Sequence, residues 1–236
     1  MGRQPGRLDR PARPLPRLAP RDGGRGMNQR VALRPTPAPA TAMNSGHDPR
    51  VLGTIALPGV AVALWQRTTD PAWQAWLDAL PPDRLPRLRQ ALRPQDAATA
   101  LRHACDAAAL ADCDHRRALI DQIAELAQHA ALSLGALMVT LRVEVTDGQS
   151  CPKWHLDAVR ARLLCTLRGA GTQFGPVSGP AQVDRIQQMP MGTAALFRGR
   201  SWGAQPTGIL HRSPPAIPGQ TRLLVVVDPV EEAASC

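Results

Sequence analysis

The chain has 236 residues and a formal net charge of +9, from 28 Lys and Arg against 19 Asp and Glu. That length is enough to bury one sizeable core. No run of about 18 apolar residues occurs and no apolar segment follows the N-terminal arginines, which excludes a predicted membrane span or secretion signal. The 5 cysteines form no Cys-x-x-Cys pair and are odd in number, which argues for reduced thiols. We expect a cytoplasmic protein without a membrane partner.

Most of the positive charge lies in residues 1–50, which hold ten Arg and three Asp. This segment is rich in Pro and Gly and lacks apolar periodicity, so it cannot bury enough surface to offset its ordering entropy. We predict a disordered basic tail over residues 1–50 and a single domain over residues 51–236. The tail has no interleaved aromatic residues, which argues against nucleic-acid binding. Met27 and Met43 are candidates for a later start of translation.

The first predicted elements are a strand and a series of helices. The apolar run Val60–Trp65 follows Pro58-Gly59 and predicts a buried strand. Asp70 suits the N-cap of a helix whose first residue is Pro71 and which ends at Pro81-Pro82. Further helices are predicted over residues 83–93, 95–105 and 114–134. The apolar seam of the last helix consists of Leu119, Ile123, Leu126 and Ala130.

After Gly135 the pattern changes to alternating, β-branched residues, beginning with Met138–Val145 and the turn signal Asp147-Gly148. Further strand candidates are residues 155–157, 162–167, 194–197, 209–211 and 222–228. Short strands joined without crossover helices predict an antiparallel sandwich or barrel with the helices outside. We therefore predict an α+β fold, with a mostly helical part over residues 51–135 and a double-stranded β-helix, or jelly roll, over residues 136–230.

The candidate chemistry is concentrated in the segment Cys151-Pro152-Lys153-Trp154-His155-Leu156-Asp157. In an extended segment, side chains two residues apart point to the same face, so His155 and Asp157 would both face inward while Trp154 and Leu156 face the other way. His211 comes far enough downstream for the chain to make two or three strands and return. Two imidazoles and one carboxylate form the ligand set of non-haem iron(II) with open coordination positions.

Arg222 begins the apolar strand Leu223–Val227, where a guanidinium needs an anionic partner such as a carboxylate. The order of His-x-Asp, a distal His and a later Arg resembles the iron(II) and 2-oxoglutarate-dependent dioxygenase superfamily. The resemblance implies an oxygenase with an unknown small-molecule or protein substrate, in which Arg222 binds 2-oxoglutarate. The implied metal ligands are His155, Asp157 and His211, and candidate pocket residues are Lys153 and Thr172.

A narrower resemblance runs from Gly59 to Asp228. The segments that carry it are Gly59–Arg67, Cys151-x-x-Trp154-His155-x-Asp157, Arg168–Thr172 and His211–Pro215. They are similar to an uncharacterised bacterial family, domain of unknown function family 1826. The resemblance implies a connection with metal, because members are associated with zinc-homeostasis genes. Some members of the family carry a desuccinylase label. A desuccinylase of the zinc carboxypeptidase type would need a His-x-x-Glu pair, and none of the 6 histidines has Glu three residues later. We therefore reject this activity for the chain.

Zinc is the competing metal. A site formed by Cys151, His155, Asp157 and His211 would have the four ligands that structural zinc prefers. The protein would then be a zinc carrier, sensor or hydrolase, and Arg222 would be structural. In a third interpretation, the histidines and the aspartate are ordinary structural residues without a metal. The orientation of Cys151 discriminates between the metals, because an inward thiol favours zinc and an outward thiol favours iron.

Overall fold

A computed structural model describes residues 2 and 37–231 of the chain. Most of the tail predicted over residues 1–50 therefore lies outside the described residues. The last part of that segment is folded, because it holds strand β1 (Ala42–Gly46) and the start of the 3-10 helix η1 (Pro49–Ala56). The folded part thus begins earlier than the composition predicted, and its residues from 37 onward belong to one compact unit.

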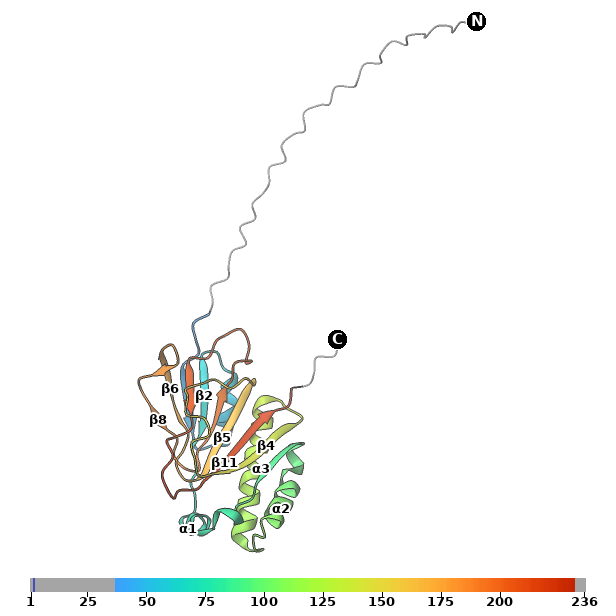
Figure 1. The fold of residues 1–236 in the computed structure, drawn as a ribbon, viewed down its shortest axis with the longest axis vertical. Helices are drawn as coiled ribbons and strands as arrows, with labels where there is room; N and C mark the ends of the chain where they lie inside the picture. The colour runs from blue at the N-terminus through green and yellow to red at the C-terminus, as the bar shows by residue number, and fades with distance from the viewer. Residues whose placement is uncertain (1, 3–36, 232–236) are drawn as a thin grey trace. The chain divides into compact units, whose positions relative to one another are not determined.

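A large sheet of seven strands has the order β1-β2-β9-β5-β11-β4-β3 (Figure 1). Its other strands are β2 (Val60–Trp65), β3 (Leu88–Leu92), β4 (Val139–Thr146), β5 (Ala161–Arg168), β9 (Ala194–Arg198) and β11 (Arg222–Pro229). Strands β1 and β2 pair in parallel, and the remaining neighbours pair antiparallel. Short antiparallel strands without crossover helices are what the sequence predicted for the C-terminal half.

A smaller sheet of four strands lies beside the large one. Its strands are β6 (Gln173–Gly179), β7 (Gln182–Val183), β8 (Gln187–Gln188) and β10 (Ile209–Arg212). Strand β6 is central, because it pairs with β10, β7 and β8. The two sheets and the helices confirm an α+β fold.

Three α-helices complete the fold: α1 (Pro71–Ala79), α2 (Ala97–Ala107) and α3 (Asp114–Leu134). Short 3-10 turns occur at η2 (Pro82–Arg84) and η3 (Pro94–Asp96). The Asp70 carboxylate caps α1 by accepting a hydrogen bond from the Trp73 amide at 2.8 Å, as predicted. Helix α3 has the predicted bounds and ends at Gly135, whose φ of 62° is the left-handed conformation that glycine adopts without strain.

Two apolar clusters hold these layers together. The larger lies between the helices and the large sheet, and it contains the predicted seam of α3, namely Leu119, Ile123, Leu126 and Ala130. Helices α2 and α3 cover the same side of the sheet (Figure 1). The smaller cluster lies between the sheets and includes Phe174, Phe197 and Val226. Strand β11 serves both clusters, because Val225 and Val227 face the helices and Val226 faces the small sheet.

Two sequence predictions of secondary structure are wrong. The helix expected over residues 83–93 is instead η2 followed by β3, which pairs with β4. Residues 155–157 form no strand, because only His155 makes a bridge, to His211. The part expected to be mostly helical, residues 51–135, also supplies β2 and β3 to the large sheet.

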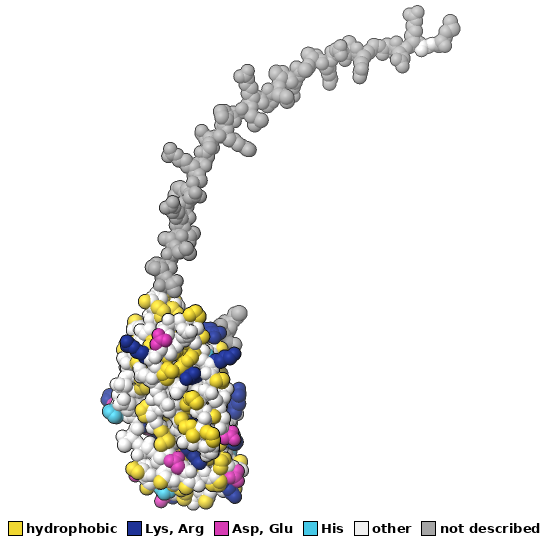
Figure 2. All heavy atoms as spheres, turned by 60° about the vertical axis from the view of Figure 1, so that its left-hand side comes forward, with side chains coloured by type: hydrophobic (Ala, Val, Ile, Leu, Met, Phe, Trp, Pro, Cys, Tyr) yellow, Lys and Arg dark blue, Asp and Glu magenta, His cyan; other side chains and the backbone are white. Residues whose placement is uncertain are grey.

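The surface is mixed in character. On the face shown in Figure 2, charged side chains of both signs lie among small groups of hydrophobic ones. In the part of the chain that the structure describes, no helix is long and apolar enough to cross a membrane.

Candidate metal centre

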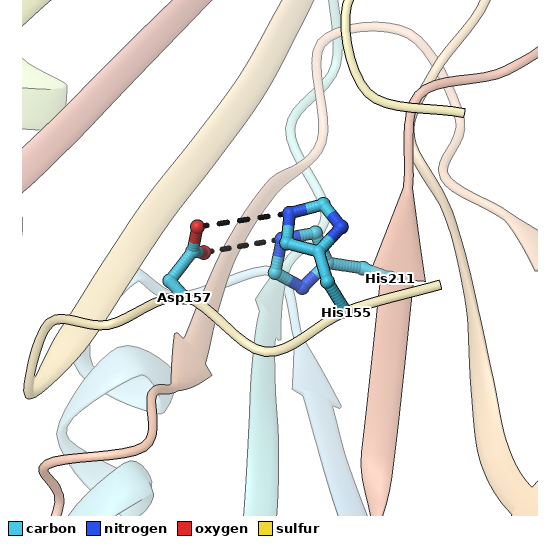
Figure 3. A group of neighbouring side chains, drawn as sticks. All are labelled: His155, Asp157 and His211. Atoms are coloured by element: carbon cyan, nitrogen blue, oxygen red, sulfur yellow. Dashed lines mark ion pairs between the residues drawn. The ribbon is translucent and has the colours of Figure 1, made fainter. Parts of the chain in front are cut away.

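The side chains of His155 and Asp157, from one loop, and of His211, from β10, point toward one another (Figure 3). One potential ligand atom of each lies within 4.8 Å of the others. His211 Nε2 is 3.1 Å from Asp157 Oδ2, and His155 Nε2 is 3.8 Å from Asp157 Oδ1. The side chains of Asp157 and His211 are 5% and 6% exposed, whereas that of His155 is 32% exposed. The group is therefore buried on one side and open on the other.

The backbone brings the two histidines together although the segment around His155 is not a strand. His155 and His211 exchange two backbone hydrogen bonds of 3.1 Å each, and their ring centroids are 4.6 Å apart. A second attachment lies nearby, where the Ser213 amide donates to the Cys151 carbonyl at 2.9 Å. The loop that carries His155 and Asp157 is thus fixed to the end of β10, which carries His211.

The position of Asp157 depends on a close backbone approach after β9. The Arg200 amide donates to the Asp157 carbonyl at 2.8 Å, and the Gly199 amide donates to the Arg160 carbonyl at 2.8 Å. A Cβ atom on Gly199 would lie 1.9 Å from the Val159 carbonyl oxygen and 3.1 Å from that of Asp157. Only glycine fits at this contact, so Gly199 allows the loop to present Asp157 to the histidines.

Arg162 is a residue of the site that the sequence did not reveal. Its Nη1 bonds Asp157 Oδ1, and its Nε and Nη2 bond the two oxygens of Asp228 at 2.6 and 2.8 Å. Burial raises the pKa of the Asp157 carboxyl, but contact with His211 and the charges of Arg162 and His155 outweigh it and hold that pKa below its usual value. Asp157 is therefore ionised, as a metal ligand must be.

The residue types and spacing fit a divalent cation. Two ligand atoms that bind one cation at about 2.1 Å and at a right angle lie about 3.0 Å apart, which is close to the 3.1 Å between His211 Nε2 and Asp157 Oδ2. The two atoms form no hydrogen bond at this distance, so the buried Asp157 Oδ2 has no hydrogen-bond partner in the described chain. A buried carboxylate oxygen without a partner is costly, and a bound cation would remove that cost.

Cys151 lies outside this group. Its side chain is exposed, and the group of potential ligands within the described residues contains only His155, Asp157 and His211. The four-ligand set expected for zinc is therefore not assembled. Lys153 is also exposed, and its backbone carbonyl, rather than its side chain, contacts His155 Nδ1 at 2.8 Å.

Arg222 is buried at the start of β11, with 8% of its surface exposed. Its Nη2 donates to the hydroxyls of Thr166 and Thr172 at 3.1 and 2.9 Å, and its Nε donates to the Ala170 carbonyl at 2.9 Å. No carboxylate of the described chain lies within ion-pair distance of its guanidinium. Burial lowers the pKa of Arg222 to about 10, an effect that Glu144 partly opposes, so the buried guanidinium is charged at neutral pH.

A cavity of about 90 Å³ joins the histidine group to Arg222. Its lining includes His155, His211, Thr172 and Arg222, together with Leu224 and Val226 of β11. Cys151 also lines it, although its side chain is exposed and lies outside the ligand group. The predicted pocket residue Thr172 lines this cavity, whereas Lys153 does not. A molecule in the cavity would therefore contact both the histidines and a guanidinium that has no anionic partner in the protein.

The chain belongs to the family described as Protein of unknown function (DUF1826), whose family model matches residues 46–228. The predicted membership is confirmed. No curated protein sequence matches the chain.

Several solved structures align with most of this chain. Dioxygenase for auxin oxidation 1 from Arabidopsis thaliana, in complex with 2-oxoglutarate, is 10% identical, with 83% of this chain and 94% of that chain covered and a TM-score of 0.46. A Pseudomonas putida prolyl-4-hydroxylase is 14% identical, with coverages of 80% and 98% and a TM-score of 0.41. A 2OG-Fe(II) oxygenase family protein from Burkholderia pseudomallei is 15% identical, with coverages of 80% and 95% and a TM-score of 0.38. TM-scores below 0.5 assign neither fold nor function.

Proposed function

We propose that this chain is an oxygenase that uses iron(II) and 2-oxoglutarate on a double-stranded β-helix, or jelly roll. The observation that carries the proposal is the buried guanidinium of Arg222, which lacks an anionic partner in the described chain and lines the same cavity as His155 and His211. A buried charge without a partner is expensive unless a ligand neutralises it. A dicarboxylate that reaches from a metal to Arg222 would do so.

The roles of the residues follow from their contacts. His155, Asp157 and His211 would hold the iron through two imidazoles and one carboxylate. Arg222 would hold the distal carboxylate of 2-oxoglutarate. Because Arg222 Nη2 donates to the hydroxyl oxygen of Thr172, the hydroxyl proton of Thr172 is free to be donated to the same carboxylate. The hydroxyl oxygen of Thr166 also accepts a hydrogen bond from Arg222 Nη2.

When bound, iron(II) supplies coordination positions at which the oxidation of 2-oxoglutarate by oxygen is coupled to oxidation of a second substrate. The chain's own residues then hold the reactants in place and exclude water. The apolar side chains of Leu224 and Val226 line the cavity between Arg222 and the histidines. Arg162 holds Asp157 ionised and oriented, so that the carboxylate does not have to reorganise when the metal binds.

The exposed position of Cys151, outside the ligand group, favours this function over a zinc carrier or sensor with a closed four-ligand site. Three protein ligands leave open positions, which catalysis needs and a closed four-ligand site lacks.

The proposal is tested by adding 2-oxoglutarate to the full chain loaded with iron(II) in the absence of oxygen. We expect a visible charge-transfer band that saturates with 2-oxoglutarate, and a dissociation constant at least tenfold higher in Arg222→Lys, because lysine lacks the planar fork of donors. The same substitution at the exposed Arg93 is the control. A band that Arg222→Lys leaves unchanged would refute the assignment of Arg222.

A further inference from the structure

The apolar cover of the large sheet ends at β11 on the side that faces the small sheet. The members of the smaller apolar cluster that lie in the large sheet come from β2, β5, β9 and β11, and none comes from β4 or β3. On β4 the same face carries Arg142 and Glu144, which lie directly opposite Val226 and Leu224 of β11. On β3, Arg89 lies directly opposite Arg142. The sheet face that begins apolar at the centre thus becomes charged at its edge.

This charged edge forms a groove that leads to the cavity at the histidines. The groove has a volume of about 450 Å³, and its charged lining residues are Arg87, Arg89, Arg142 and Glu144. Arg142 and Glu144 also line the cavity of about 90 Å³ that holds the histidines and Arg222. A molecule in the groove would therefore reach the metal centre past these two side chains.

The groove has an excess of positive charge. Three arginines against one glutamate give a formal charge of 3 − 1 = +2. Arg142 is already engaged, because it bonds Glu144 at 3.0 Å and Asp228 at 3.3 Å. Arg87 bonds only the Val145 carbonyl, at 2.8 Å, and neither Arg87 nor Arg89 has a carboxylate within ion-pair distance among the described residues. The two arginines at the outer end are the ones without an anionic partner.

Arg142 has an unsatisfied hydrogen-bond donor at the inner end of the groove. Its Nε is buried and has no hydrogen-bond partner in the described part of the chain. A buried donor without an acceptor costs free energy, which a polar group of a bound molecule would recover. The groove therefore offers positive charge at its mouth and a hydrogen-bond donor at its junction with the cavity.

We propose that the compound oxidised at this centre is an anion with a carboxylate or phosphate group, which lies in the groove with its charge on Arg89 and Arg87. Its reacting end points past Arg142 and Glu144 toward the histidines. This inference rests on the proposed function, because it names the second substrate of the same centre. Arg222 does not compete for this anion, since the proposed function assigns it to 2-oxoglutarate.

The test uses four probes of similar size: benzoate, phenyl phosphate, benzylamine and benzamide. Binding of each to the full chain is measured by equilibrium dialysis, with iron(II) and saturating 2-oxoglutarate present and oxygen absent, so that Arg222 is occupied. We expect benzoate or phenyl phosphate to be retained and the amine and amide not. The anion that binds more tightly distinguishes a carboxylate from a phosphate substrate. Equal retention of benzylamine or benzamide would overturn the proposal.

Variants locate the binding. Arg89→Gln should weaken binding of the retained anion at least tenfold, and Arg93→Gln, just beyond the end of β3 and outside the groove, should leave it unchanged. Anion binding that survives both Arg89→Gln and Arg87→Gln would contradict the groove assignment. The 2-oxoglutarate charge-transfer band is recorded in the same samples. If the wild-type chain shows no band, the proposed function is refuted, whatever anion it binds. If the band is present but anion binding does not depend on Arg89, only the substrate class is refuted.

Discussion

Arg162 bonds Asp157 at Oδ1 and thereby leaves Oδ2 as the carboxylate oxygen that faces His211 Nε2. The same guanidinium bonds both oxygens of Asp228, at the end of β11. One arginine on β5 therefore connects the candidate ligand to the centre of the large sheet. The connection continues to the charged groove of β3 and β4, because Asp228 also bonds Arg142, which in turn bonds Glu144.

Replacing Arg162 by Leu should destabilise the protein and weaken metal binding together. The Arg162 side chain is only 20% exposed, and its loss leaves the Asp157 carboxylate without its guanidinium partner. Removing one partner of a buried ion pair costs about 3–5 kcal/mol. Denaturant unfolding and metal titration of the full chain measure both effects. Arg93→Leu is the matched control, and a variant Arg162→Leu with unchanged stability would show that the ion pairs contribute nothing.

Substitution of either histidine by Ala should abolish metal binding without loss of the fold. His155 is the sharper test, because its side chain is 32% exposed and its removal leaves little cavity. We expect its unfolding free energy to change by less than about 1 kcal/mol, as at other partly exposed positions. Circular dichroism and metal titration check this prediction, with His103→Ala, an exposed histidine on α2, as the control. Metal affinity that survives His155→Ala would exclude it as a ligand.

Gly199→Ala should disrupt the centre although residue 199 contacts no metal ligand through a side chain. The added Cβ would lie 1.9 Å from the Val159 carbonyl oxygen, so the loop that carries Asp157 must move. Gly53→Ala is the matched control, since a Cβ there has no neighbour within 4 Å. We expect at least tenfold weaker metal binding in the first variant and wild-type affinity in the second. Equal affinities would mean that the close approach does not position Asp157.

Much of the fold could be predicted from local patterns, and the exceptions have a physical cause. Helix α3 has the predicted bounds because its apolar seam and its glycine end are encoded within the segment itself. Strand β3 lies in the segment 83–93, for which the sequence predicts a helix. Leu88 and Leu92 are four residues apart, a spacing that fits one face of a helix as well as one face of a strand. Both leucines are instead packed in the larger apolar cluster by pairing with β4, a contact that no local pattern reveals.

The candidate site, like the fold, could be predicted from the sequence only in part. The motif His-x-Asp with a later His and Arg can be read from the sequence, and the structure brings His155, Asp157 and His211 into one group and places Arg222 on the same cavity. The part played by Arg162 could not be read from the sequence. Its partner Asp228 lies on another strand, and its partner Asp157 lies five residues earlier in a loop without regular structure, which no periodic pattern describes. Alternation along β5 indicates only which face a side chain occupies, and not what it meets there.

The buried thiol of Cys165 predicts a loss of stability at high pH. Burial raises the pKa of this thiol to about 11 from the usual 9.0, so the folded state holds its proton while the unfolded state loses it. Stability is therefore fully present below pH 9 and falls between pH 9 and 11, by about 3 kcal/mol for this group. Denaturant unfolding at pH 8 and pH 11 should show a smaller difference in Cys165→Ala than in the wild type. Equal differences would mean that Cys165 ionises as freely in the folded state.

The central claim is tested most directly by the metal content of the full chain, purified without added metal and without a histidine tag, followed by an assay of 2-oxoglutarate decarboxylation with iron(II) and ascorbate. We predict near-stoichiometric iron, or zinc that iron displaces, with 2-oxoglutarate turnover that Asp157→Ala abolishes. Tightly held zinc without any turnover would contradict the account, as would a protein that binds no metal.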